Sequence, residues 1–146
     1  MESKMKQTSV TVVQKIQAPV DAVWETISAI GGVDKWSGMI KTCRVEGSGA
    51  GAKRFCTMTD GGELNENIDL VDHEKKVFQY SIPEPPMPIK DYVGTMKIKE
   101  TGKNGETEVT WSASFKVEES DESEMRAMLE GAYADGITGI GQVSVA

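Results

Sequence analysis

The stretch MIKTCRVEGSGAGAKRFCTMT, residues 39–59, decides which fold the sequence predicts. Its centre carries a glycine at every second position from 47 to 51, followed by Lys53 and Arg54. A phosphate-binding glycine loop leads from a strand into a helix, whose free N–H groups hold the anion. Here residues of alternating character lie on both sides of the glycines, and the spacing G-x-G-x-G matches neither nucleotide-binding motif. The stretch therefore predicts the bend of a hairpin between two strands.

Both cysteines of the chain lie in this hairpin. If Glu46 pairs with Lys53, then Cys43 lies opposite Cys56 on one face of the sheet. The pair is open to two interpretations: a redox-active or ligand-reactive pair, or two small apolar residues in a wall. Because the chain has no C-x-x-C spacing, we favour the wall. Two cysteines make no disulfide framework, so we expect reduced thiols and a cytoplasmic protein.

The spacing of apolar residues predicts the other elements. Alternation with a period of two predicts strands over residues 9–16, 39–46, 54–59, 64–70, 77–82, 91–99 and 107–117. Helical spacing predicts a helix over 19–30, a short helical turn over 33–36, and a long helix after Val117. Glycines weaken the far end of the long helix, so we expect it to end near Gly139. Successive hairpins give an antiparallel sheet with the helices gathered on one side, which is an α+β fold.

Composition argues against several classes of function. A length of 146 residues predicts a single domain. The formal net charge of −7 would repel the phosphate backbone of a nucleic acid, so nucleic acid is not expected as a partner. No apolar run approaches the roughly 20 residues needed to span a bilayer, so no stable membrane insertion is expected. The N-terminal segment MESKMKQTSVTVV lacks the apolar core of a signal peptide. With His73 as the one histidine, placed in a charged turn, and two cysteines, no metal site is expected.

Five segments occur in an order typical of one superfamily. They are KIQAPVDAVWETIS (15–28), KWSGMIKTCRVEGSGAGAKR (35–54), NENIDLVDHEKKVFQYSI (65–82), PMPIKDYVGTMKI (86–98) and TEVTWSASF (107–115). Together they resemble the START-like, helix-grip superfamily, which includes the birch-pollen-allergen-like proteins and the polyketide cyclase/dehydrase and lipid-transport branch. The resemblance implies a curved seven-stranded antiparallel sheet wrapped around a long C-terminal helix, with two short helices after the first strand. It also implies that residues 1–146 form one ligand-binding domain that needs no cofactor.

Within the superfamily, the strand MIKTCRVE and the run from Glu66 to Tyr92 are similar to the plant abscisic-acid receptors. The resemblance implies that Lys41 meets a ligand carboxylate, that Glu66 acts through water and that Tyr92 lines the pocket. It implies apolar wall positions at Tyr80, Ile82 and Ile89. The receptors' Ser-Gly-Leu-Pro-Ala gate and His-Arg-Leu latch have no counterpart, because DGGE and PPMPIK stand in their places. We therefore expect a related pocket without hormone sensing through a phosphatase partner.

Lys41, Arg54 and Glu66 each fall on a strand face whose other residues are apolar. A charge left unpaired in an apolar interior costs several kcal/mol, so these groups must pair, reach water or meet a ligand. We predict a wet cavity in which Lys41, near Glu66, fixes the head of an amphipathic ligand. The alternative is a bulge that shifts the register and places these residues in surface salt bridges.

The predicted ligand-binding residues come from the inward strand faces, a proline-rich loop and the helical stripe. They are Lys41, Cys43, Arg54, Cys56, Met58, Glu66, Ile68, Tyr80, Ile82, Met87, Ile89, Tyr92, Met96, Trp111, Met125, Leu129 and Tyr133. The loop SIPEPPMPIKD (81–91) is stiffened by its prolines. Within it, Met87 and Ile89 form either an apolar lid over the cavity or part of a rigid surface turn.

Two functions from different classes are compatible with such a cavity. The first is a carrier or sensor, monomeric or weakly homodimeric, that binds a lipid, a polyketide or an isoprenoid-like molecule. The second is a cofactor-independent cyclase or dehydratase, in which Glu66, Lys41 and Tyr92 exchange protons with the substrate. Because the sequence has no paired-carboxylate, Ser-His-Asp or Cys-His arrangement, we favour the binding protein.

Overall fold

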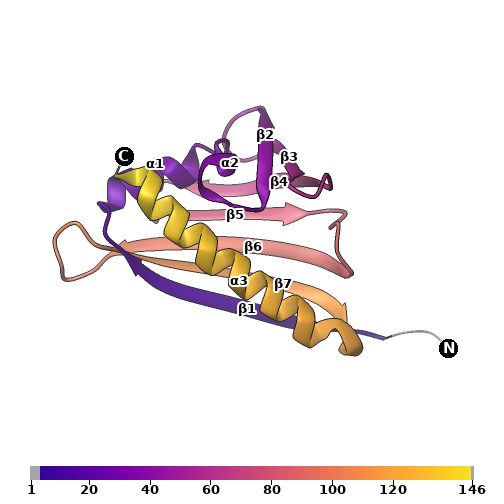
Figure 1. Cartoon of the computed structure of the whole chain (residues 1–146). Helices are drawn as coiled ribbons and strands as arrows, with labels where there is room; N and C mark the ends of the chain where they lie inside the picture. The colour runs from indigo at the N-terminus through magenta and orange to yellow at the C-terminus, as the bar shows by residue number, and fades with distance from the viewer. Residues whose placement is uncertain (1–3, 146) are drawn as a thin grey trace.

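The computed structural model describes residues 4–145, so residues 1–3, at the start of the N-terminal segment, and Ala146 lie outside it. Within that range, seven strands form one antiparallel sheet in the order β1-β7-β6-β5-β4-β3-β2 (Figure 1). The strands are β1 Met5–Ile16, β2 Ile40–Glu46, β3 Lys53–Met58, β4 Glu63–Asp72, β5 Val77–Ile82, β6 Ile89–Glu100 and β7 Thr107–Glu118. From β2 to β7, each strand pairs with the one that follows it in the chain, and β1 pairs with β7. The predicted seven-stranded antiparallel sheet is confirmed.

Three helices accompany the sheet in the described part of the chain: α1 Val20–Ser28, α2 Val33–Trp36 and α3 Glu119–Ser144. Helix α3 runs diagonally across one face of the sheet, and its C-terminal end lies near α1 (Figure 1). It packs against β1, β7 and both short helices. The predicted α+β helix-grip fold, with two short helices after the first strand, is therefore confirmed. No helix within residues 4–145 has the length and apolar character needed to cross a membrane.

The glycine-rich stretch forms the predicted hairpin loop between β2 and β3. Its three glycines, Gly47, Gly49 and Gly51, have φ angles of 87°, 59° and 94°, which residues with a side chain rarely adopt. The chain continues from the loop into a strand and not into a helix, so the stretch provides no helix N-terminus for a phosphate.

The cysteines lie opposite each other as the hairpin register predicts, but they form a disulfide instead of the expected reduced thiols. Their Cα atoms are 4.2 Å apart, because the two residues face each other directly on neighbouring strands. Cys56 is buried and Cys43 is half-buried. The expectation from composition is wrong here because the register of the hairpin, and not the number of cysteines, sets how close two sulfur atoms come.

Helix α3 continues to Ser144, so the predicted end near Gly139 is also wrong. Gly139 and Gly141 lie where a Cβ atom would meet the backbone of Trp36 and the side chain of Ile16. The glycines let α3 approach these residues closely. Tertiary packing therefore stabilises the last turns of the helix and outweighs the low helix propensity of glycine.

The core between α3 and the β1–β7 side of the sheet is filled by apolar side chains. Alternate residues of β7 point inward and are buried: Val109, Trp111, Ala113, Phe115 and Val117. Ile137 and Ile140 of α3 are fully buried as well. This packing fixes the helix on one part of the curved sheet.

Candidate functional site

A cavity of about 90 Å³ lies between α3 and strands β3–β5. Because α3 rests on β1 and β7, the curved sheet carries β3 and β4 away from the helix (Figure 1). The apolar lining consists of Val33, Trp36, Met39, Ile40, Cys56, Met58, Leu64, Ile82, Met87, Trp111, Met128, Leu129 and Ala132. The polar lining consists of Ser37, Arg54, Glu66, Tyr80, Tyr92 and Tyr133. An engineered apolar cavity of about 150 Å³ binds benzene, so this smaller cavity takes a single ring only if its walls move.

Most of the predicted ligand-binding residues lie in this lining. They are Arg54, Cys56, Met58, Glu66, Tyr80, Ile82, Met87, Tyr92, Trp111, Leu129 and Tyr133. Four others, Ile68, Ile89, Met96 and Met125, are buried in the core outside the lining. Cys43 is half-buried beside Cys56 and is likewise outside the lining.

The placement predicted for Lys41 is wrong. The pairing of β2 with β3 shifts between Ile40, opposite Met58, and Thr42, opposite Thr57, so Lys41 is the extra residue of a bulge. The bulge breaks the alternation of faces, and the Lys41 side chain is exposed. Among residues 4–145, therefore, no lysine lines the cavity to meet a ligand carboxylate or to exchange protons there.

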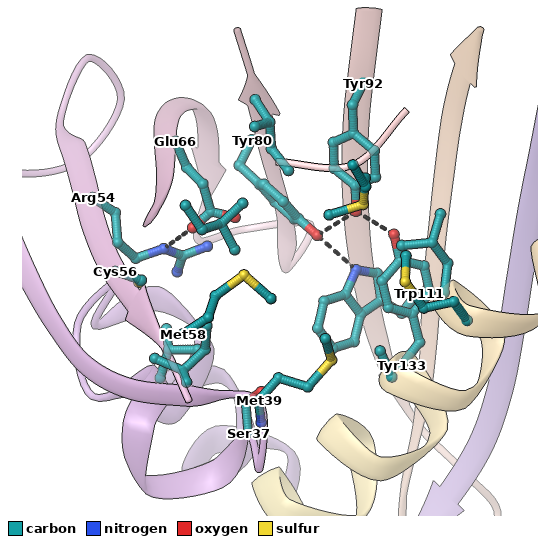
Figure 2. Close-up of a pocket in the computed structure, with 18 of the residues that line it drawn as sticks. Ser37, Met39, Arg54, Cys56, Met58, Glu66, Tyr80, Tyr92, Trp111 and Tyr133 are labelled. Carbon is teal, nitrogen blue, oxygen red and sulfur yellow. Dashed lines mark hydrogen bonds and ion pairs between the residues drawn. The ribbon is translucent and has the colours of Figure 1, made fainter. Parts of the chain in front are cut away.

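Arg54 and Glu66 form a buried ion pair at one end of the cavity (Figure 2). They face each other on β3 and β4, and Arg54 Nε donates to Glu66 Oε1 at 2.6 Å. Both side chains are 6% exposed. The guanidinium also lies 5.5 Å from the ring centroid of Tyr80. The alternative of surface salt bridges is thus excluded for these two residues, and the pair carries no net charge into the interior.

Arg54 also ties the loop after α1 to the sheet. Its Nη1 donates to the carbonyl oxygen of Ile30 at 2.8 Å. Ile30 has a φ of 69°, a conformation that β-branched residues rarely adopt. The hydrogen bond from Arg54 helps to hold this segment, which leads into α2 and the Trp36 wall of the cavity.

Three tyrosine hydroxyls meet at the other end of the cavity (Figure 2). Tyr80 and Tyr92 share a hydrogen bond of 2.8 Å, and Tyr92 shares another with Tyr133. The indole N–H of Trp111 donates to the Tyr80 hydroxyl at 3.0 Å. Gly94, opposite Tyr80 on β6, makes this arrangement possible, because a Cβ atom there would overlap the Tyr80 ring.

The tyrosines stay protonated over the physiological range. Burial raises the pKa of Tyr80 to about 12, with the nearby Glu66 carboxylate acting in the same direction. Burial also raises the pKa of Tyr92 and of Tyr133 well above the ordinary value. The cluster therefore presents neutral hydroxyl donors to the cavity and no phenolate.

Methionine side chains form much of the remaining wall. Met39, Met58, Met87 and Met128 line the cavity. Met87 comes from the proline-rich loop, whereas Ile89 of that loop is buried at the start of β6. Flexible, polarisable methionines adapt to ligands of different shape, so this side of the cavity can adjust to its occupant.

The histidine considered in the sequence analysis lies outside the cavity. His73 is exposed and accepts a hydrogen bond at Nδ1 from the Trp24 indole at 3.0 Å. Neither residue lines the cavity. Among residues 4–145, no group of three or more His, Cys, Asp or Glu side chains is placed to hold a metal ion.

The family described as polyketide cyclase / dehydrase and lipid transport matches residues 7–144, nearly the whole chain. The protein belongs to this family. The START-like resemblance found in the sequence is thereby confirmed. No curated protein sequence matches the chain significantly.

Several solved structures have the same fold as this protein. The protein XoxI from Bacillus cereus has a TM-score of 0.84 and 23% identity, with 94% of this chain and 96% of that chain covered. Norcoclaurine synthase from Thalictrum flavum, in complex with dopamine and hydroxybenzaldehyde, has a TM-score of 0.78 and 19% identity. That match covers 97% of this chain and 88% of the synthase. At these identities the likeness shows the fold.

Several of the residues that line the cavity are not predicted from the sequence. They are Val33, Trp36, Ser37, Met39, Ile40, Leu64, Met128 and Ala132. A signal existed for Met39, Leu64 and Met128, which fall on the inward strand faces and on the helical stripe. Trp36 and Ser37 gave none, because the docking of the four-residue helix α2 against α3 is decided by tertiary packing.

Proposed function

We propose that residues 1–146 act as one ligand-binding domain that carries or senses a hydrophobic or amphipathic small molecule in the cavity between α3 and β3–β5. The observation that carries this proposal is the cavity itself, an apolar chamber with polar groups held at its two ends (Figure 2). Protein interiors contain few voids larger than a water molecule. A cavity of about 90 Å³ leaves its lining atoms with few packing partners, and an occupant would supply them.

Family membership supports the proposal, since the family's description includes lipid transport. The norcoclaurine synthase of the same fold holds dopamine and hydroxybenzaldehyde, two small ring compounds. Ligands of that size come closer to the volume of the cavity, about 90 Å³, than a long acyl chain does.

Native mass spectrometry of the protein purified from its own host tests the proposal. A retained organic mass is expected on the unmodified protein. Ala132→Phe puts a ring into the cavity and should abolish the retained mass, whereas Ala127→Phe lies on the exposed side of the same helix and should keep it. Thermal melts of both variants check that they fold. A mass that survives in Ala132→Phe, or no mass on any form after refeeding with host extract, would contradict the proposal.

A second candidate function is a cofactor-independent cyclase or dehydratase. It is favoured by the presence of a buried carboxylate, Glu66, and neutral hydroxyl donors, Tyr80 and Tyr92, in one chamber. Because Lys41 is exposed, proton exchange would fall to these groups. Turnover of the retained compound that Glu66→Gln abolishes, with binding intact, would assign the protein to this class.

A further inference from the structure

The hydroxyl cluster has one O–H hydrogen that its two internal hydrogen bonds do not use. Tyr80, Tyr92 and Tyr133 supply three O–H hydrogens, and only two hydrogen bonds join the three oxygens. The Trp111 indole brings its own hydrogen to Tyr80, so it uses an acceptor site and not a hydroxyl hydrogen. Whichever way the two bonds run, one O–H has no acceptor among residues 4–145. All three tyrosines line the cavity, so this donor is available to an occupant.

The Trp111 bond favours one direction for the chain of hydrogen bonds. An oxygen that accepts a hydrogen bond becomes a better donor, and bonds that run head to tail strengthen one another. The favoured order therefore runs from Trp111 through Tyr80 and Tyr92 to Tyr133. In this order the unused hydrogen belongs to Tyr133, whose ring stacks on Trp111 with a centroid distance of 4.3 Å.

The charges of the cavity restrict the ligand further. Arg54 and Glu66 neutralise each other at 2.6 Å, and Lys41 is exposed outside the cavity. The tyrosines are neutral. A carboxylate or an ammonium group would therefore enter an interior whose described lining offers it no uncompensated opposite charge, which is strongly unfavourable.

We propose that the cavity takes a neutral single-ring compound that carries a ketone or aldehyde oxygen, and that this oxygen accepts a hydrogen bond from the Tyr133 hydroxyl. A carbonyl oxygen accepts the unused hydrogen and adds no further O–H or N–H that would itself need an acceptor in the cavity. A single ring is the largest ring system that a volume of about 90 Å³ takes, and the flexible methionine side chains of the wall supply the remaining room by moving. This inference rests on the proposed function and specifies the class of ligand.

Three compounds of nearly the same shape separate the possibilities: acetophenone, α-methylstyrene and benzoate. The first has the carbonyl oxygen, the second replaces it with a CH₂ group, and the third is an anion. Binding is followed by NMR of ¹³C-labelled methionine methyl groups, because Met58 and Met128 line the cavity and Met5, in β1, does not. Acetophenone should bind about three- to tenfold more tightly than α-methylstyrene, the gain of one neutral hydrogen bond. Benzoate should bind at least about a hundredfold more weakly than acetophenone.

Tyr133→Phe should remove the preference for acetophenone over α-methylstyrene while α-methylstyrene still binds. Tyr92→Phe is the comparison variant, because it leaves the Tyr133 hydroxyl in place but removes the hydrogen bond that Tyr133 accepts, so it should reduce the preference without abolishing it. Equal binding of the two neutral compounds, tighter binding of benzoate, or a preference that survives Tyr133→Phe would overturn the inference. These results leave the proposed function standing. If none of the three compounds binds, the inference fails, and the mass-spectrometry experiment decides separately whether the proposed function fails with it.

Discussion

Two regions under the same helix are built in opposite ways. Where α3 lies over β1 and β7, the space is filled, and Phe115, Ile137 and Ile140 have no solvent exposure. We call this the filled region. Between α3 and β3–β5, which we call the hollow region, the walls carry an ion pair, three hydroxyls and several methionines around a cavity. The difference is that packing is complete in the filled region and incomplete in the hollow region, around the cavity that we propose as a ligand site.

The largest effect is expected at the buried ion pair of the hollow region. Arg54→Met leaves the Glu66 carboxylate buried without its partner, which should lower the free energy of unfolding by about 3–5 kcal/mol. The double variant Arg54→Met, Glu66→Met should recover most of this loss, because neither charge of the pair remains. Chemical denaturation measures the free energy of unfolding of the single and the double variant.

Arg44→Met, on the neighbouring strand, is the control for the ion pair. Arg44 also pairs with a glutamate, Glu46, but both side chains are more than half exposed, at 63% and 59%. Exposed pairs contribute little, so this variant should leave the denaturation midpoint nearly unchanged. Equal losses in Arg54→Met and Arg44→Met would show that burial of the Arg54 pair has no consequence for stability.

Truncation on the two sides of α3 sharpens the comparison directly. Ile137→Ala in the filled region should cost about 2–5 kcal/mol, since it opens a void among fully buried side chains. Met128→Ala on the same helix should cost less than about 1 kcal/mol, because Met128 is half-buried at the edge of a space that already exists. Thermal and urea unfolding of the two variants measures how much free energy of unfolding each one loses. Similar losses would remove the distinction between the regions.

The close approach of α3 to α2 predicts opposite effects for two glycines of one helix. Gly139→Ala places a Cβ atom against the carbonyl of Trp36, a backbone group that cannot easily move, and should cost about 3 kcal/mol. Gly131→Ala meets nothing within 4 Å and should stabilise the protein by about 0.5–1 kcal/mol through helix propensity. Melting temperatures that fall in both variants would contradict this account of the helix end.

The effect of the hydroxyl cluster on stability is the smallest at neutral pH, because it arises only in alkaline solution. All three tyrosines of the chain belong to it, so the phenolate absorbance near 295 nm reports on the cluster alone. The folded pKa of Tyr80 is raised by burial to about 12, above the unfolded value of about 10. Stability is therefore fully present below pH 10 and falls between pH 10 and 12, by at most about 1.4 kcal/mol per pH unit for each tyrosine. The folded protein should show little change in phenolate absorbance at pH 10. A half-maximal change at that pH would mean that the hydroxyls are exposed to water, which would contradict the buried cluster.

Alternation carried most of the fold prediction because the inward residues of each strand have to be apolar wherever one face is buried. β7 shows this clearly, with its inward side chains buried from Val109 to Val117. The same rule placed Arg54 and Glu66 correctly on the inner face. It failed at Lys41, because a single extra residue in β2 reverses the faces and leaves no mark in the sequence.

The sequence by itself determined the order of strands and helices, the glycine hairpin and the position of Cys43 opposite Cys56, because periodicity and turn residues are local properties of the chain. Tertiary structure alone decided that α3 runs on to Ser144, that Lys41 faces solvent and that three tyrosines from β5, β6 and α3 bring their hydroxyls together. Each of these depends on how closely distant segments approach. That distance is set by side-chain packing across the whole molecule and not by any short stretch of residues.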